Sequence, residues 1–167
     1  MGNIYKILDA SAFIGGYQVE DNLNYTVPEI TSEVKDLKSK IYLDQIISEG
    51  KLTIKSPQEF YINKLIEIIK TSGDELRLSY PDRQLLALAL EINDINDNIL
   101  FLTDDYSIQN VLKILNIPFQ SIMTEGIKGV YNWVKTCEGC KKEYSSDYEE
   151  ELCEICGSKI FKRRIKN

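Results

Sequence analysis

Ile4-Tyr5-Lys6-Ile7-Leu8-Asp9 is a short apolar run that ends in an acid, and Ile99-Leu100-Phe101-Leu102-Thr103-Asp104-Asp105 shows the same pattern. Short apolar runs that stop at polar residues predict buried strands. Much of the chain between them has helical periodicity, with apolar residues on one face of each segment. Strands that alternate with helices predict a parallel sheet with right-handed crossovers. We therefore expect an α/β domain in which two strands carry acids to one edge of the sheet.

The remaining elements follow from periodicity and from helix-stop signals. Gly50 and Gly73 lie where helices are expected to end, and Ser79 is expected to cap the helix that begins at Tyr80-Pro81. Strands are predicted at 4–8, 52–55, 99–103 and 117–122, and helices at 11–16, 31–49, 58–71, 80–92 and 106–115.

The composition excludes several classes of protein. With 167 residues, 43% of them hydrophobic, the chain can bury a core and is not disordered throughout. No run of about 18 apolar residues and no apolar leader is present, so we expect a cytoplasmic protein without a membrane segment. The absence of histidine excludes Ser-His-Asp and Cys-His catalysis and histidine metal ligands. A net charge of −6 argues against coating nucleic acid by bulk attraction.

The end of the chain differs from the rest in cysteine content and in charge. All four cysteines lie in the last 31 residues. Residues 1–134 carry 12 basic and 19 acidic side chains, whereas residues 135–167 carry 8 and 7. Gly126 and Gly129 loosen the chain between the two parts. We therefore expect an α/β domain over 1–125, a linker over 126–134, and a small domain with a basic tail over 135–167.

Acids from four segments are predicted at the same edge of the sheet. Asp9 follows the first strand and Asp104-Asp105 follows the third, where open parallel sheets bind ligands. Glu33 and Asp82 are expected in the first turns of their helices. Taken alone, Glu33 or Asp82 also fits a helix cap, because first-turn carboxylates complement the helix dipole, and Asp9 could cap the turn at Ser11. Together they would repel one another unless a cation held them, and without histidine the fitting cation is Mg²⁺ or Mn²⁺.

A carboxylate-held cation suits phosphodiester hydrolysis, because it lowers the pKa of water and neutralises phosphoryl oxygens. The motifs around the acids resemble, in order, those of PIN-domain ribonucleases. They read Asp9-Ala10-Ser11-Ala12-Phe13-Ile14, Thr31-Ser32-Glu33-Val34, Leu78-Ser79-Tyr80-Pro81-Asp82 and Thr103-Asp104-Asp105-Tyr106. The resemblance covers residues 4–122 and implies four catalytic acids, Asp9, Glu33, Asp82 and Asp105, that bind one or two Mg²⁺ or Mn²⁺ ions and cleave RNA. It also implies that Asp104 is a helper and that Ser11 and Thr103 supply hydroxyls.

The cysteines form two pairs with metal-ligand spacing. Cys137-Glu138-Gly139-Cys140 and Cys153-Glu154-Ile155-Cys156 are CxxC motifs separated by 12 residues. Such a motif lets two thiolates reach one ion, and four thiolates form a closed, structural zinc site. Disulfides are not expected in a cytosolic chain, and a thioredoxin-like site needs one CxxC within a βαβ unit. Spacing alone leaves iron open as the metal. We expect a zinc ribbon with one Zn²⁺ per chain that supplies much of its stability.

The ribbon also carries residues that suit RNA. Its cations could contact phosphates, and Tyr144, Tyr148 or Phe161 could stack on bases. The alternative is a solvated charged face, because Glu149-Glu150-Glu151 lies in the same module. The candidate RNA contacts are Lys141, Lys142, Lys162, Arg163 and Arg164.

A PIN domain followed by a four-cysteine ribbon resembles the archaeal Nob family, which trims the 3′ end of small-subunit ribosomal RNA. The stretches 126–133 and 103–110 also look like that family's sequences, although no glycine follows Cys140 where many ribbons have one. The resemblance implies a metal-dependent single-strand RNA endonuclease that leaves a 5′-phosphate and a 3′-hydroxyl. Its implied partners are the pre-ribosomal particle and other assembly factors, and no organic cofactor is implied.

Three other interpretations deserve comparison. A PIN toxin of the VapC type shares the acids but typically lacks a zinc ribbon. A non-catalytic rRNA-binding assembly factor would keep a relict acidic site, although all four acids are present here. A receiver-type phospho-acceptor domain would need a lysine just after a late strand, whereas 117–122 is followed by Met123-Thr124-Glu125.

Overall fold

The computed structural model describes residues 2–123 and 131–166. The first part is built on a five-stranded parallel sheet in the order β3-β2-β1-β4-β5. Its strands are β1 (Tyr5–Leu8), β2 (Asn24–Thr26), β3 (Leu52–Ile54), β4 (Ile99–Leu102) and β5 (Phe119–Gln120). β1 and β4 are neighbours, and Leu8 lies opposite Leu102. The two acid-ending strands therefore finish side by side, which is the condition for Asp9 and the Asp104/Asp105 pair to converge.

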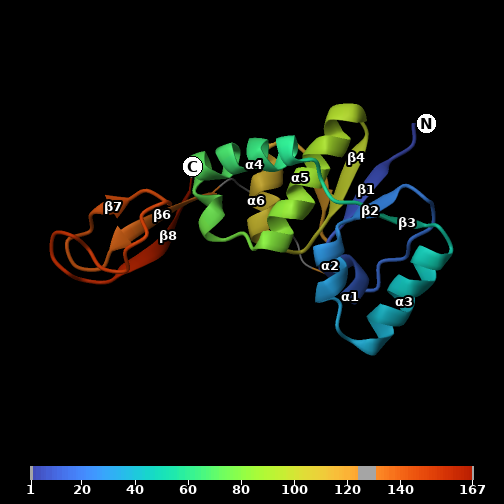
Figure 1. The fold of residues 1–167 in the computed structure, drawn as a ribbon, viewed down its shortest axis with the longest axis horizontal. Helices are drawn as coiled ribbons and strands as arrows, with labels where there is room; N and C mark the ends of the chain where they lie inside the picture. Colours follow the sequence, from blue (N-terminus) through green and yellow to red (C-terminus); the bar gives the residue numbers. More distant parts are fainter. Residues whose placement is uncertain (1, 124–130, 167) are drawn as a thin grey trace.

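Helices flank this sheet (Figure 1). They are α1 (Ala10–Ile14), α2 (Pro28–Glu33), α3 (Leu37–Ser48), α4 (Glu59–Ser72), the 3₁₀ helix η1 (Asp74–Leu76), α5 (Tyr80–Ile95) and α6 (Tyr106–Ile114). α5 is the most buried helix, with Leu85, Leu86, Leu88 and their neighbours inaccessible to solvent. It contacts β1, β4, α4 and α6, so it fixes the helices that surround the sheet.

In the first part of the chain, one predicted helix is wrong and one strand is missing from the prediction. The single helix expected at 31–49 is split, because Val34 is extended (φ −76°, ψ 101°) and Asp36 caps a new helix by accepting from Ser39 N at 2.8 Å. The strand β2 was not predicted, since it has only three residues and no apolar run. Asn24 is buried there and donates to Lys51 O at 3.1 Å, which links β2 to the start of β3.

The second part is a small antiparallel sheet in the order β7-β6-β8. Its strands are β6 (Tyr131–Cys137), β7 (Glu143–Tyr144) and β8 (Ile160–Lys166). Its buried cluster consists of Cys137, Tyr144 and Cys153, with Tyr148 and Ile160 packed against it. Of the segment assigned to a linker, 126–130 lies outside the described residues, whereas 131–134 belongs to β6.

Contacts of β6 with α4 and η1 hold the ribbon against the α/β domain, from which it projects at the α4 side (Figure 1). The Arg77 guanidinium lies 4.3 Å from the centre of the Trp133 ring, and Lys162 Nζ donates to Leu76 O at 2.7 Å. Gly73 closes α4 with a φ of +77°, and a Cβ there would lie 1.8 Å from Trp133 O. No helix in the described part of the chain has the length and apolar character needed to span a membrane.

Candidate active site and cysteine cluster

Asp9 lies at the centre of the acidic edge, directly after β1. Its carboxylate caps α1 by accepting from Ala10 N at 2.8 Å, and it accepts from Thr103 Oγ1 at 2.7 Å. Thr103 follows β4, and its hydroxyl also accepts from Asp105 N at 3.0 Å. One buried hydroxyl therefore joins the ends of the two central strands and fixes the position of Asp9 relative to Asp105.

Asp82 and Asp105 reach the same edge from helix N-termini. Asp82 forms a capping box with Ser79, in which Ser79 N donates to Asp82 Oδ2 at 2.8 Å. Asp105 caps α6 and accepts from Ser107 N at 2.7 Å. The helix-cap role expected for Asp82 is thus confirmed, and Asp105 caps a helix without having been predicted to do so. In these positions Asp82 and Asp105 lie close enough to Asp9 for their charges to raise its pKa.

Electrostatics connect these acids. Burial raises the pKa of Asp9 to about 6, against the opposing hydrogen bonds from Thr103 and Ala10, and the charges of Asp82 and Asp105 raise it further. Burial also raises the pKa of Asp82, again with a contribution from Asp105. A buried carboxylate whose pKa is raised by burial and by neighbouring negative charges is expected at a site that holds a cation.

Glu33 is not in the first turn of a helix, contrary to prediction. It is the last residue of α2, because the chain becomes extended at Val34. Its pKa is nevertheless raised, first by burial and then by the charges of Asp82 and Asp105. The side chain therefore faces the same acidic edge from the opposite end of a helix.

Asp104 differs from the other acids in its hydrogen-bond partners. Its carboxylate accepts from Ile122 N at 2.8 Å and from Met123 N at 3.1 Å, and its own N–H donates to Ser11 Oγ at 3.1 Å. Asp104 thereby holds the chain after β5 against the loop after β4. This geometry favours a positioning role for Asp104 beside the acids.

The donor set fits a hard divalent cation. All the side chains offered at this edge have oxygen ligands, which Mg²⁺ and Mn²⁺ prefer. Their oxygens are spread wider than a closed cage, since among the described residues only the cysteines offer three or more potential ligand atoms within 4.8 Å of one another. An open oxygen site suits Mg²⁺, which usually keeps several waters.

The cysteine cluster is compact by comparison. Cys137 Sγ lies 3.3 Å from Cys156 Sγ, and Cys140 Sγ lies 3.5 Å from Cys153 Sγ. The two loops repeat one hydrogen bond, Cys137 N to Lys142 O and Cys153 N to Ser158 O. A hydrogen bond from Ser158 lowers the pKa of Cys156 to about 5, which favours the thiolate that a metal needs. Four sulfur ligands at this spacing fit a tetrahedral metal ion.

Lys141 shows how the first knuckle forms without glycine. It has a φ of +64°, close to the +71° of Gly157 at the equivalent position after Cys156. Because β-carbons make this left-handed region unfavourable, the first knuckle carries strain that the second avoids.

The five candidate RNA contacts do not form one face. β8 is a strand, so alternate side chains point to opposite sides of the sheet. Lys162 and Arg164 lie opposite Lys135 and Trp133, whereas Arg163 lies on the other face. There it pairs with Glu143 at 2.7 Å, and Lys141 and Phe161 flank it beside a surface pocket.

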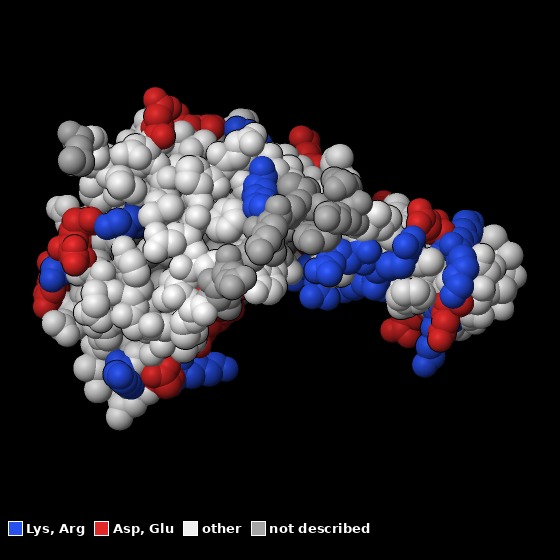
Figure 2. Space-filling model, turned by 180° about the vertical axis from the view of Figure 1, so that it is seen from behind, with Lys and Arg blue, Asp and Glu red and all other residues white. Residues whose placement is uncertain are grey.

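The ribbon nevertheless presents a basic surface. Lys142 is paired with Glu154, and Lys141 Nζ donates to Glu138 O at 2.7 Å. Figure 2 shows Lys and Arg side chains gathered on the ribbon next to the α/β domain. Lys162 reaches back to the α/β domain through Leu76 O, so its strand runs beside the junction.

Tyr144 cannot stack on RNA in this structure. Only 8% of it is exposed, and its hydroxyl lies 3.0 Å from Cys153 Sγ. Tyr148 packs against it with ring centres 4.2 Å apart. Phe161 is 42% exposed, so it is the aromatic residue of the three that offers an open face.

Comparisons with known proteins agree with this architecture. Residues 7–92 match the family model described as the PIN domain of ribonuclease. The chain is 44% identical to "Endoribonuclease Nob1" of Methanothermobacter thermautotrophicus, over 97% of this chain and 94% of that protein. It is 46% identical to "Endoribonuclease Nob1" of Methanocaldococcus jannaschii, over 97% of this chain and 79% of that protein.

Some relatives carry a different name. "Ribonuclease VapC1" of Thermoplasma acidophilum is 31% identical over 96% of this chain and 78% of its own length. That alignment must include part of the ribbon, so the ribbon alone does not separate the two names. Identity to the Nob1 relatives is higher and also spans nearly the whole chain. The parallel sheet with its acidic edge, the cysteine ribbon and these alignments together show that the chain belongs to the archaeal Nob1 family of PIN-domain endoribonucleases.

Proposed function

We propose that this chain is a Mg²⁺- or Mn²⁺-dependent endonuclease that cleaves single-stranded RNA at the 3′ end of the small-subunit ribosomal RNA precursor. Its place of action would be the cytoplasm, on the pre-ribosomal particle and beside other assembly factors. The observation that carries the proposal is the shared acidic edge, where Asp9 is buried between the charges of Asp82 and Asp105. The names of the Nob1 relatives support RNA as the substrate.

Asp9, Glu33, Asp82 and Asp105 would hold the cation. When bound, Mg²⁺ or Mn²⁺ supplies a lowered pKa for water and neutralises charge on a phosphoryl oxygen. The chain's own contribution is positional: Thr103 orients Asp9, and the helix caps orient Asp82 and Asp105. Asp104 would keep the segment at Ile122 and Met123 against the site. The family resemblance implies products with a 5′-phosphate and a 3′-hydroxyl.

A direct test uses RNA that ends in the 3′ region of the small-subunit precursor. The full chain is incubated with this RNA in the presence of Mn²⁺, and in parallel with excess chelator. We expect one principal cut that requires Mn²⁺, because the acids alone cannot activate water. Absence of cleavage, or equal cleavage in chelator, would contradict the proposed function.

In the ribbon, Cys137, Cys140, Cys153 and Cys156 would hold one Zn²⁺ and keep the basic surface folded. Lys141, Lys142, Lys162, Arg163 and Arg164 would then contact RNA phosphates. Because the cations lie on two faces of the sheet, paired substitutions can find the face that binds. Lys162→Gln with Arg164→Gln alters one face, and Lys141→Gln with Arg163→Gln alters the other.

RNA affinity measured against salt concentration separates these outcomes. Substitution on the binding face should weaken affinity and reduce the salt slope by about 1 for each lost phosphate contact. Truncation after Trp133 should lose more, because the remaining domain is acidic. Equal slopes for wild type, both pairs and the truncated chain would mean that the ribbon faces a protein partner or solvent.

A second candidate function follows from the VapC1 relative, namely a ribonuclease toxin. The two functions differ in substrate breadth. A processing enzyme should cut the precursor at one position and ignore unrelated RNA. A toxin should cut other cellular RNA and arrest growth when expressed, and D82N should abolish that arrest.

A further inference from the structure

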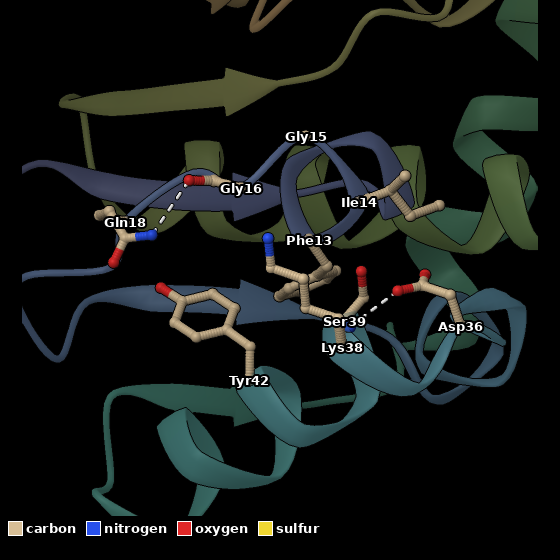
Figure 3. Close-up of a pocket in the computed structure, with 9 residues that line it drawn as sticks. All are labelled: Phe13, Ile14, Gly15, Gly16, Gln18, Asp36, Lys38, Ser39 and Tyr42. Atoms are coloured by element: carbon tan, nitrogen blue, oxygen red, sulfur yellow. Dashed lines mark hydrogen bonds between the residues drawn. The ribbon is translucent and has the colours of Figure 1, made fainter.

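A pocket opens beside the acidic edge, between the end of α1 and the start of α3. It encloses about 400 Å³. Figure 3 shows Phe13 at its floor, Gly16 and Gln18 on one side, and Lys38 and Tyr42 on the other. We propose that this pocket binds one nucleotide of the RNA strand next to the cleaved phosphate. The inference rests on the proposed function and adds a recognition subsite to it.

Tyr42 supplies a fixed aromatic surface. The residue is half-buried, and its hydroxyl accepts from Val19 N at 2.8 Å. This hydrogen bond and the attachment to α3 hold the ring at both ends, so it loses little freedom when a base stacks on it. Aromatic rings that stack on unpaired bases are a common means of binding single-stranded RNA.

Lys38 supplies a positive charge at the pocket, and this charge contributes to lowering the pKa of the neighbouring Asp36, after the hydrogen bonds from Ser39. Its ammonium group points into the pocket in Figure 3 and has no hydrogen-bond or ion-pair partner in the described part of the chain. The nearby Asp36 carboxylate is already engaged as the cap of α3, through Ser39 N. The Lys38 ammonium is the cation of this pocket that a phosphate group would contact.

Gln18 offers an adaptable polar group at the rim. Its Nε2 donates to Gly16 O at 3.1 Å, which leaves the side-chain carbonyl as an acceptor. Base amino groups are suitable donors for such an acceptor. The pocket thus combines a stacking surface, a cation and a hydrogen-bond acceptor, which match the base and the phosphate of one nucleotide.

Continuity with the acids identifies the occupant as part of the same RNA. Asp9 caps the N-terminus of α1, and the pocket begins at the C-terminus of this five-residue helix. At 1.5 Å per residue, the helix separates them by roughly 7 Å. In Figure 1, α3 lies on the side of the α/β domain away from the ribbon, so a strand that contacts the ribbon and crosses the acids would continue toward the pocket.

The pocket's size argues against larger ligands. Its volume lies near the lower end of ligand pockets, which suits a single nucleotide. A peptide helix or an RNA duplex would need a longer groove. A free nucleotide would fit sterically, but it would gain nothing from the adjacent cation site, whereas a strand would occupy both.

The test compares exposed residues of the same helix. Lys38→Glu reverses the charge inside the pocket, and Lys40→Glu is the matched control, because Lys40 is exposed and does not line the pocket. The full chain is titrated with a fluorescent single-stranded oligonucleotide from the 3′ region of the precursor, in chelator so that no cleavage occurs. We expect K38E to weaken binding about tenfold and K40E to change it by less than about twofold.

A second measurement addresses the stacking surface. Oligonucleotides with one abasic position each are bound to wild type, Y42F and Y42L. Wild type and Y42F should lose about tenfold in affinity at one position, because both keep the ring. Y42L should bind intact and abasic oligonucleotides equally. If Y42L does not fold, the comparison of K38E with K40E decides the question.

The outcomes distinguish failure of the proposed nucleotide subsite from failure of the proposed nuclease activity. Equal affinities of wild type, K38E and K40E, or abasic losses at no position, would overturn the subsite whatever the cleavage result. Cleavage of the same oligonucleotide in Mn²⁺ is measured separately. A protein that fails to cleave but loses affinity only with K38E would keep the subsite and overturn the nuclease proposal.

Discussion

The acidic edge and the cysteine cluster gather four side chains each, but by opposite routes. The cysteines lie within 137–156, on two short loops, and their sulfurs approach to 3.3 and 3.5 Å. The acids are spread over 9–105 and arrive from two strand ends and two helices. Local sequence assembles the first group, whereas only the order of strands in the sheet assembles the second.

The two groups also differ in what holds them. The cysteines form much of their own domain's core, so the ribbon has little to bury without a metal. The acids lie at the edge of a large apolar core that does not depend on them. Loss of a metal should therefore unfold the ribbon but only inactivate the α/β domain.

Removal of one acid should stop the chemistry and spare the fold. We expect D82N to lower the rate of RNA cleavage by about 100-fold or more, because both cation binding and charge neutralisation depend on this carboxylate. D94N is the matched control, since Asp94 lies near the other end of the same helix and pairs with Lys64 at the surface. The measurement is single-turnover cleavage in Mn²⁺, with zinc content as a check on the ribbon. Wild-type rates for D82N would remove Asp82 from the site.

Removal of one cysteine should unfold the ribbon and spare the α/β domain. C153S leaves three sulfur ligands and breaks the contact of Tyr144 with Cys153. We expect zinc content to fall from about one per chain to near zero, with hydrogen exchange of β6 amides accelerated by at least about 100-fold. The melting temperature of the α/β domain should change by only a few degrees, because its core is separate. A single cooperative loss of both domains would show that the ribbon supports the α/β domain after all.

How far each site could be predicted from the sequence depends on how close its residues lie along the chain. The cysteine site is predictable from the sequence, because the spacing of a CxxC motif is a local feature. Asp9 and Asp105 were predicted to meet because parallel strands end at one edge, and β1 and β4 do pair. The placement of Glu33 was wrong because Val34 interrupts the helix, and no breaker residue marks that position.

Features that depend on tertiary contacts were not predictable. The pocket at Tyr42 needs α1 to lie beside α3, and helical periodicity does not show which exposed residues line such a gap. The contact between Arg77 and Trp133 joins the two domains across 56 positions of sequence. The division of the basic tail between two faces also depends on structure, because the alternation of side chains along β8 separates Lys162 from Arg163.

The repulsion at the acidic edge predicts a stability gain on neutralising Asp9. Its pKa is raised from 3.8 to about 6 in the folded state, so ionisation destabilises the metal-free fold above that pH. Below about pH 4 the carboxyl is protonated in both states and the penalty vanishes. D9N should therefore raise the free energy of unfolding by about 1–2 kcal/mol near pH 8, less than the full shift implies because Asn cannot keep every hydrogen bond.

Denaturant unfolding in chelator measures this effect. The advantage of D9N should shrink as the pH falls from about 8 to about 4, since the wild-type carboxyl then gains its proton. D97N is the control, because Asp97 is exposed to solvent and its replacement removes one carboxylate without relieving any burial. A D9N protein that is less stable than wild type at high pH would mean that Thr103 and Ala10 stabilise the charge more than burial opposes it.

The smallest effect concerns the two cysteine knuckles, which differ at one backbone position. Lys141 and Gly157 both have positive φ, but only the glycine adopts it without strain. K141G should relieve that strain and G157A should introduce it, each by about 1 kcal/mol. A Cβ at Gly157 meets no atom within 4 Å, so the cost of G157A is conformational rather than a clash.

Because folding of the ribbon is coupled to metal binding, K141G should raise zinc affinity about fivefold and G157A should lower it by a similar factor. Competition with a chelator of known affinity measures both changes. Changes of the same sign would mean that the knuckles are not equivalent and that the Lys141 side chain, through its bond to Glu138 O, stabilises its loop by more than its backbone costs.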